Sequence, residues 1–194
     1  MSTVNEPDGV DDSYDSYDSY DAMTLGAMLK RREKLENAAA TRLGEILFAY
    51  GAFERQLDFC IVCIRAGQRR DRLTSMIQDY SLDKKIELLA TFVDQIFAKG
   101  SEQHTAYQQW VVTAHAIRLN RNDLAHGWWD VDDRKAQVIN YRGIATAEPR
   151  EQRYTLDGLE FFEQKIRASA SELSRLREQF PLETAAGILG EGGF

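Results

Sequence analysis

Residues 38–65 read AAATRLGEILFAYGAFERQLDFCIVCIR, and this stretch decides the fold. Its apolar residues recur every three or four positions, which is the spacing of one face of an α-helix. The pattern persists for about seven turns, so we expect a long helix that buries a continuous stripe and ends at Gly67. The stripe consists of Leu43, Ile46, Leu47, Tyr50, Phe53, Leu57, Cys60, Ile61 and Ile64.

Other segments have the same periodicity or carry helix-end signals. A short basic helix is expected to lead into the long one, and Ser81 and Thr155 are N-cap candidates for two later helices. Residues 68–73 carry three arginines and predict a basic loop or the start of a helix. The expected helices cover residues 23–36, 38–65, 81–97, 102–125 and 155–180.

Two short segments, residues 128–132 and 136–141, alternate apolar and polar residues and are rich in β-forming types. They predict a small β-hairpin, followed by a polar loop through Pro149. The chain has no glycine-rich phosphate loop and no alternation of strands with helices. The sequence therefore predicts an all-α fold, a bundle of four to five helices with a β-hairpin inserted after the helix over 102–125.

The charge is unevenly distributed over the 194 residues. Seven of the 31 acidic residues lie in residues 1–21, which contain no Lys or Arg, and the other 24 equal the number of Lys and Arg. Residues 12–21 repeat Asp-Ser-Tyr, so we expect an acidic low-complexity tail over 1–22, which is either a bland solvated tail or a segment that docks on a basic surface. One helical domain over 23–181 and a flexible tail over 182–194 complete the expected organisation.

The two cysteines, Cys60 and Cys63, lie three residues apart in the long helix, where disulfide geometry is rare. They are expected to be reduced core residues, which favours a reducing compartment. No apolar run approaches the roughly 20 residues that span a bilayer, and the acidic N-terminus does not resemble a signal peptide. We expect a cytoplasmic protein that does not associate with membranes.

The densest group of polar side chains is RLNRNDLAHGWW at residues 118–129, at the end of the expected fourth helix. Arginine can hold a phosphate through two hydrogen bonds, and histidine titrates near pH 6.5. These are the groups needed to cleave RNA without a metal: a base for the ribose 2′-hydroxyl and a positive charge for the phosphorane. Arg121 and His126 lie about 140° apart on a regular helix, so they converge only if the last turn loosens or two chains meet.

Residues 121–126, RNDLAH, match the signature of the HEPN (higher eukaryotes and prokaryotes nucleotide-binding) superfamily: an arginine, a polar residue, three further residues and a histidine. The segments YGAFE at 50–54 and SLDKK at 81–85 also resemble bacterial HEPN-like proteins. The resemblance covers roughly residues 40–180. It implies an all-α homodimer whose two motifs face each other across a cleft.

In its active members the resemblance implies a metal-independent endoribonuclease, often a toxin of a toxin–antitoxin pair or an effector of phage defence. Arg121 would then hold the scissile phosphate, Asn122 would orient the pair, and His126 would act as acid or base. Arg118 and Glu54 are supporting candidates. In toxins paired with a nucleotidyltransferase antitoxin a tyrosine stands two residues after the histidine, where this chain has Trp128, so that partnership is not expected.

Other interpretations of the same residues stay open. Arg121 and His126 can simply stabilise the end of the helix, and the alternative to a ribonuclease is a non-catalytic dimer that binds RNA, a nucleotide or a partner protein. Trp128 can stack on bases or pack on the hairpin, and His115 can line the cleft or lie at the bundle edge. His104, His115 and His126 share a helix face, but the roughly 16 Å between successive members prevents a common metal site. We expect no metal and no cofactor.

Overall fold

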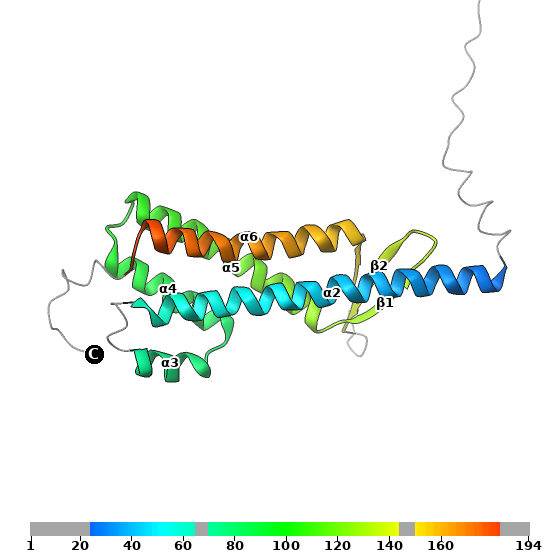
Figure 1. Ribbon diagram of the computed structural model, residues 1–194, viewed down its shortest axis with the longest axis horizontal. Helices are drawn as coiled ribbons and strands as arrows, with labels where there is room; N and C mark the ends of the chain where they lie inside the picture. Colours follow the sequence, from blue (N-terminus) through cyan, green and yellow to red (C-terminus); the bar gives the residue numbers. More distant parts are fainter. Residues whose placement is uncertain (1–23, 65–69, 144–149, 183–194) are drawn as a thin grey trace, which may run out of the picture.

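The computed structural model describes residues 24–64, 70–143 and 150–182. The expected acidic tail, the helix end at Gly67, the loop before Pro149 and the C-terminal tail beyond Leu182 lie outside these residues. The described chain is a helical bundle with one small antiparallel sheet at its side (Figure 1). This arrangement confirms the helical bundle expected from the sequence.

The longest element is helix α2, Leu25–Val62, which runs through the bundle and projects beyond it (Figure 1). The hydroxyl of Thr24 caps its start by accepting a hydrogen bond from the backbone N–H of Ala27 at 3.4 Å. The prediction of two helices in this region was wrong, because no glycine or proline separates the basic segment from the apolar stripe. The helix buries Ala39, Ile46, Ala49, Tyr50, Phe53, Leu57, Cys60, Ile61 and Val62.

Helix α6, Leu156–Gln179, lies parallel to α2 (Figure 1). Thr155 caps its start as predicted, accepting from the N–H of Gly158 at 3.0 Å. Two hydrogen-bonded pairs between the helices join residues 118 positions apart, so the register is constant along the contact. The contacts are Arg42 to Glu160 at 2.6 Å, Gln56 to Ser174 at 2.6 Å, and the Arg177 guanidinium over the Phe59 ring at 4.5 Å.

Helices α4, Leu82–Ile96, and α5, Glu102–Ala125, match their predicted ranges closely. They are antiparallel: Asp94, near the end of α4, bonds His104 near the start of α5 at 3.0 Å. The short helix α3, Arg70–Gln78, begins within the segment predicted as a basic loop or helix start.

The predicted hairpin is part of a three-stranded antiparallel sheet, ordered β1-β2-β3. Strands β1, Trp128–Asp132, and β2, Gln137–Arg142, are the expected pair, and β3, Arg150–Tyr154, is an additional edge strand. The sequence prediction missed β3 because its residues are polar and mostly exposed, without the alternation that marks a half-buried strand.

Two residues tie the sheet to the projecting half of α2. Arg32 donates a hydrogen bond to the carbonyl of Val131 at 3.3 Å and forms an ion pair with Asp130. The long helix therefore fixes the position of β1, the strand that directly follows the polar end of α5.

The core lies among α2, α4, α5 and α6 and extends under the sheet through Val131 and Val138. Leu182, the last described residue, is 1% exposed and belongs to this core. Cys60 is buried and Cys63 is half-buried, and they do not form a disulfide with each other. Among the described residues, no helix combines the length and the apolarity required to cross a bilayer.

Candidate functional site

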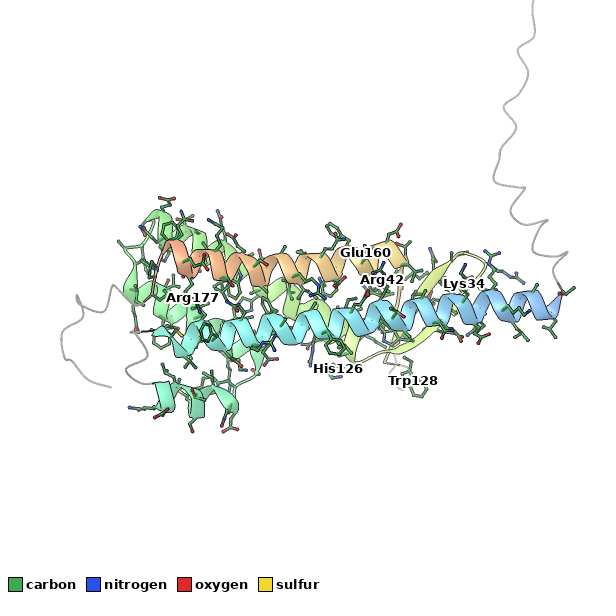
Figure 2. All side chains as sticks on the ribbon, viewed as in Figure 1. Lys34, Arg42, His126, Trp128, Glu160 and Arg177 are labelled. Atoms are coloured by element: carbon green, nitrogen blue, oxygen red, sulfur yellow. The ribbon has the colours of Figure 1, made fainter. Side chains whose placement is uncertain are left out.

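The polar residues of the RNDLAH segment lie at the C-terminal end of α5. The helix is regular through Ala125, and His126 is its C-cap residue, with φ −114° and ψ 17°. The His126 side chain is exposed and makes no hydrogen bond or ion pair with any residue in the described ranges. Figure 2 shows His126 and Trp128 projecting on the side of the view opposite α6.

Arg121 is half-buried one turn before the end of α5. Its guanidinium carbon lies 5.5 Å from the centre of the Tyr50 ring on α2, a cation–π contact. One terminal nitrogen lies 3.5 Å from the Asn122 side-chain oxygen, the outer limit of a hydrogen bond, and the Nε atom is buried without a partner. Within the described chain, no carboxylate pairs with Arg121.

Tyr50 forms the floor beneath Arg121. The residue is 5% exposed, and its hydroxyl has no hydrogen-bond partner among the described residues. Burial raises the pKa of the Tyr50 phenol, and Glu54 adds to this rise, whereas the Arg121 and Arg118 charges oppose it. The phenol is therefore neutral at ordinary pH, and its contact with Arg121 is a contact between a cation and a neutral ring.

Arg118 and His115 of α5 belong to a separate cluster, which forms around Asp83 of α4. Asp83 in the first turn of α4 lies 2.9 Å from Nε of Arg118 and 3.3 Å from Nδ1 of His115. The Arg118 contact is an ion pair, but Nε of Arg118 does not donate a hydrogen bond to Asp83. The charge of Arg118 is thus largely balanced within the chain, in contrast to that of Arg121.

Glu54 belongs to a third group, centred on Lys85. The Lys85 ammonium is 2.9 Å from the Glu54 carboxylate and 2.8 Å from that of Asp58. Burial alone would lower the pKa of Lys85, but its hydrogen bonds to Asp58 and Glu54 outweigh burial and raise it. Glu54 therefore balances a buried lysine that joins α2 to α4, and it makes no contact with the RNDLAH residues among the described interactions.

Of the two adjacent tryptophans, Trp129 packs and Trp128 does not. The Trp129 indole donates to the carbonyl of Leu124 at 3.2 Å and lies 5.8 Å from the Tyr154 ring. Trp128 is 75% exposed, next to the exposed His126. On α2 and α5, Phe48, Leu47 and Leu119 are also exposed, with 83%, 57% and 54% of their surface open.

Gly127 joins α5 to the sheet, and its backbone lies close against a side chain of β2. A Cβ atom at this position would lie 2.1 Å from the side-chain amide of Asn140 on β2, which is 1% exposed. The φ angle of Gly127 is not positive, so Gly127 does not form a left-handed helix cap. Asp123 of α5 also pairs with Arg142 of β2, and these contacts fix the turn that presents His126.

In the structure, the Arg121 side chain contacts those of Asn122 and Tyr50. The sequence pattern predicts only a core position for Tyr50. The structure does not join Arg121 to His126 by any interaction among the described residues, and it places His115 and Arg118 around Asp83. The described chain contains no group of three His, Cys, Asp or Glu side chains arranged to hold a metal ion. Comparisons with protein-family models, curated proteins and solved structures found no match.

The site offers an unbalanced guanidinium held in place by an aromatic ring, an amide beside it, and an exposed imidazole just beyond the helix end. A guanidinium that lacks a carboxylate partner is available to an anion, and its planar shape suits a phosphate. An exposed imidazole can donate a hydrogen bond to a bound ligand or accept one from it. The arrangement is capable of binding a phosphate group at Arg121, and His126 lies exposed beyond the end of the same helix.

Proposed function

We propose that this chain is a metal-independent endoribonuclease of HEPN type that acts as a homodimer. The observation that carries the proposal is the state of Arg121: it is half-buried, fixed on the Tyr50 ring and not paired with a carboxylate of the described chain. The neighbouring Arg118 and Arg142 are each balanced by an aspartate. Arg121 is therefore the cation of this helix end that is open to a phosphate.

In the proposed reaction, His126 accepts the proton of a ribose 2′-hydroxyl, and the resulting oxygen attacks the adjacent phosphorus. Arg121 stabilises the negative charge that develops on the phosphorane oxygens. The bond to the 5′-oxygen breaks, leaving a 2′,3′-cyclic phosphate and a 5′-hydroxyl. The proton for the departing oxygen comes from the second copy of the motif.

A second chain is part of this proposal because Arg121 and His126 make no contact within one chain. Trp128 and Leu119 are exposed apolar side chains next to the motif in sequence, and they are suitable for covering by another copy. In that arrangement, each cleft would combine the arginine and histidine of two helix ends. A role as a toxin or defence effector belongs to the same proposal.

The alternative is a non-catalytic helical dimer that binds RNA, a nucleotide or a partner protein through the same surface. The specific observation in its favour is the orientation of Asn122, whose oxygen faces Arg121, while His126 has no orienting partner among the described residues. Catalytic histidines are usually held by a second group. An unheld imidazole is compatible with binding alone.

The test incubates the purified full chain with cellular RNA in EDTA. We expect wild-type protein to degrade the RNA and His126→Ala to leave it intact while remaining dimeric by light scattering. His104→Ala is the matched control, because His104 lies on the same helix roughly 33 Å away and bonds Asp94. Equal cleavage by wild type and His126→Ala would refute the assigned role, and RNA binding without cleavage would support the alternative.

A further inference from the structure

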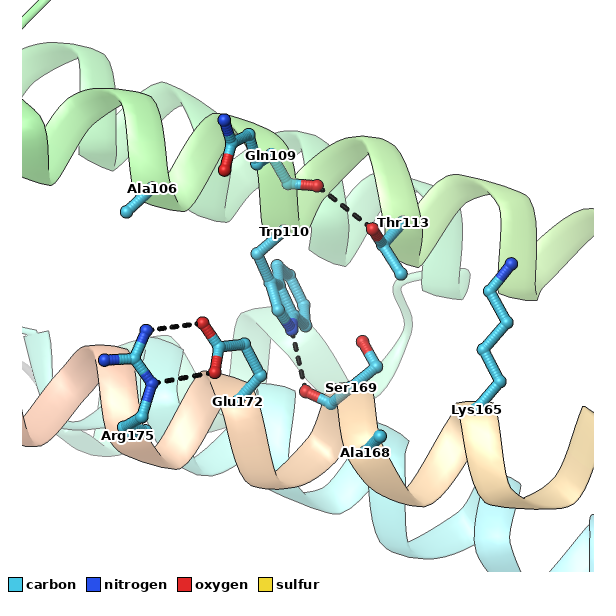
Figure 3. A pocket seen from close by; sticks show the side chains of 9 residues that line it. All are labelled: Ala106, Gln109, Trp110, Thr113, Lys165, Ala168, Ser169, Glu172 and Arg175. Atoms are coloured by element: carbon cyan, nitrogen blue, oxygen red, sulfur yellow. Dashed lines mark hydrogen bonds and ion pairs between the residues drawn. The ribbon is translucent and has the colours of Figure 1, made fainter.

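A cleft between α5 and α6 is separate from the polar end of α5. It is an open groove of about 470 Å³, and its walls come from the first half of α5 and from residues 165–175 of α6. Figure 3 shows Trp110 reaching from α5 onto α6 in the middle of this cleft. The residues that line the cleft include Trp110, Thr113, Lys165, Ser169, Glu172 and Arg175.

The floor of the cleft contains a buried hydroxyl that lacks a partner. Ser169 is 5% exposed, and its Oγ atom makes no hydrogen bond with any described residue. A serine within a helix commonly donates to the carbonyl four residues earlier, but Ser169 does not. Its backbone carbonyl accepts the indole N–H of Trp110 at 2.8 Å, which fixes the Trp110 side chain at the floor.

The charged side chains at the two ends of the cleft differ in their partners. At one end the Arg175 guanidinium holds Glu172 through two nitrogens, at 2.7 and 2.8 Å, so these charges cancel. At the other end Lys165 reaches from α6 toward α5 (Figure 3) and makes no hydrogen bond or ion pair with the described residues. The lining therefore carries one unbalanced positive charge, on the same side as the unpartnered hydroxyl.

We propose that this cleft binds a small organic oxyanion, a carboxylate or a phosphate monoester on a short apolar body. The anionic oxygens lie between the Lys165 ammonium and the Ser169 hydroxyl, which donates its proton to one of them. The apolar body lies against the neighbouring alanines of the two helices, beside Trp110, which is 3% exposed. Recognition uses one charge-assisted contact, one hydroxyl and a small apolar wall.

This site is independent of the proposed ribonuclease. Its residues face the groove between α5 and α6, whereas Arg118 and His115 of the same α5 contact α4. Replacement of Arg121 is accordingly expected to leave binding in the cleft unchanged. The ribonuclease proposal and the anion-binding proposal can therefore each fail without affecting the other.

The test uses the full chain labelled with ¹⁵N and follows the indole N–H resonance of Trp110, the donor to the Ser169 carbonyl. Trp128→Phe and Trp129→Phe variants identify the other two indole signals. Butyl phosphate, butyrate and the neutral butanol are titrated at constant ionic strength. We expect a saturable shift of the Trp110 signal with one or both anions and none with butanol, and the tighter anion identifies the source of the oxyanion.

Variants then assign the contacts. We expect Lys165→Gln to weaken binding about fivefold or more, while Arg167→Gln, an exposed cation on the same helix, leaves it unchanged. Ser169→Ala is expected to weaken binding about two- to fivefold without lowering the unfolding temperature, because the hydroxyl has no partner to lose among the described residues. The proposal is overturned if neither anion saturates, if butanol shifts the signal equally, or if Lys165→Gln binds like wild type.

Discussion

The guanidinium carbon of Arg121 lies 5.5 Å from the centre of the Tyr50 ring, and the Tyr50 hydroxyl has no partner in the described chain. The ring, rather than the hydroxyl, is therefore the part of Tyr50 that positions Arg121. We expect Tyr50→Phe to retain RNA cleavage and stability within about 1 kcal/mol, because the cation–π contact and the packing survive.

Tyr50→Leu removes the aromatic face and is expected to reduce cleavage more than Tyr50→Phe does, with a stability loss of about 1–3 kcal/mol. The two variants are compared by cleavage rate at saturating RNA and by urea unfolding. Equal cleavage rates in the two folded variants would show that the ring does not position Arg121. Arg121→Gln is the reference for complete loss of the cation.

Among the described glycines, Gly127 is the one at which we expect an added methyl group to lower the free energy of unfolding most. An alanine Cβ would lie 2.1 Å from the buried Asn140 amide, so Gly127→Ala should destabilise the fold by about 1–3 kcal/mol. Gly51→Ala is the matched control, because a Cβ there meets nothing within 4 Å and alanine favours the helix by about 0.5–1 kcal/mol. Urea unfolding of both variants measures the difference, and a Gly127→Ala protein as stable as wild type would contradict the close approach.

Lys85 joins α2 to α4 through two carboxylates, and its side chain is 6% exposed. Lys85→Met leaves Glu54 and Asp58 as neighbouring charges without a cation. Because both carboxylates retain access to water, we expect a loss of about 1–3 kcal/mol, below that of a fully buried pair. Lys84→Met, next in sequence and over the Tyr80 ring, should cost clearly less in the same thermal unfolding assay.

The fold should lose stability at alkaline pH. Burial raises the pKa of Tyr154 from 10.0 to about 12, with Asp123 adding to the rise and Arg142 opposing it. The folded state therefore binds more protons than the unfolded state between these values, so this contribution is complete below pH 10 and disappears as pH rises toward 12. Tyr154→Phe should flatten the dependence of unfolding free energy on pH in this window, and an unchanged slope would contradict the shift.

The sequence predicted the helices α4, α5 and α6 because their apolar stripes and the Ser81 and Thr155 caps are local signals. It missed β3 because an exposed edge strand made of Arg150, Glu151 and Gln152 has no burial pattern. The prediction of two helices over α2 fails because no helix-breaking residue lies where the basic segment meets the apolar stripe, so the helix continues through it.

The candidate site was predictable in part for the same reason. Arg121, Asn122 and His126 are neighbours in sequence, so a local sequence motif can identify them. The pairing of Glu54 with Lys85, of Arg118 with Asp83, and of Arg121 with Tyr50 depends on which helices pack together. Spacing along one helix carries no information about those partners.

The central claim is that Arg121 and His126 cleave RNA through the ribose 2′-hydroxyl. The most direct measurement incubates the chain in EDTA with an end-labelled RNA and with the same oligonucleotide 2′-O-methylated at every ribose. The account predicts that wild type cleaves only the unmodified RNA and leaves new 5′-hydroxyl ends that a polynucleotide kinase can label, while Arg121→Gln and His126→Ala leave it intact. Cleavage of the methylated strand, or the absence of cleavage by a dimeric wild-type protein, would contradict it.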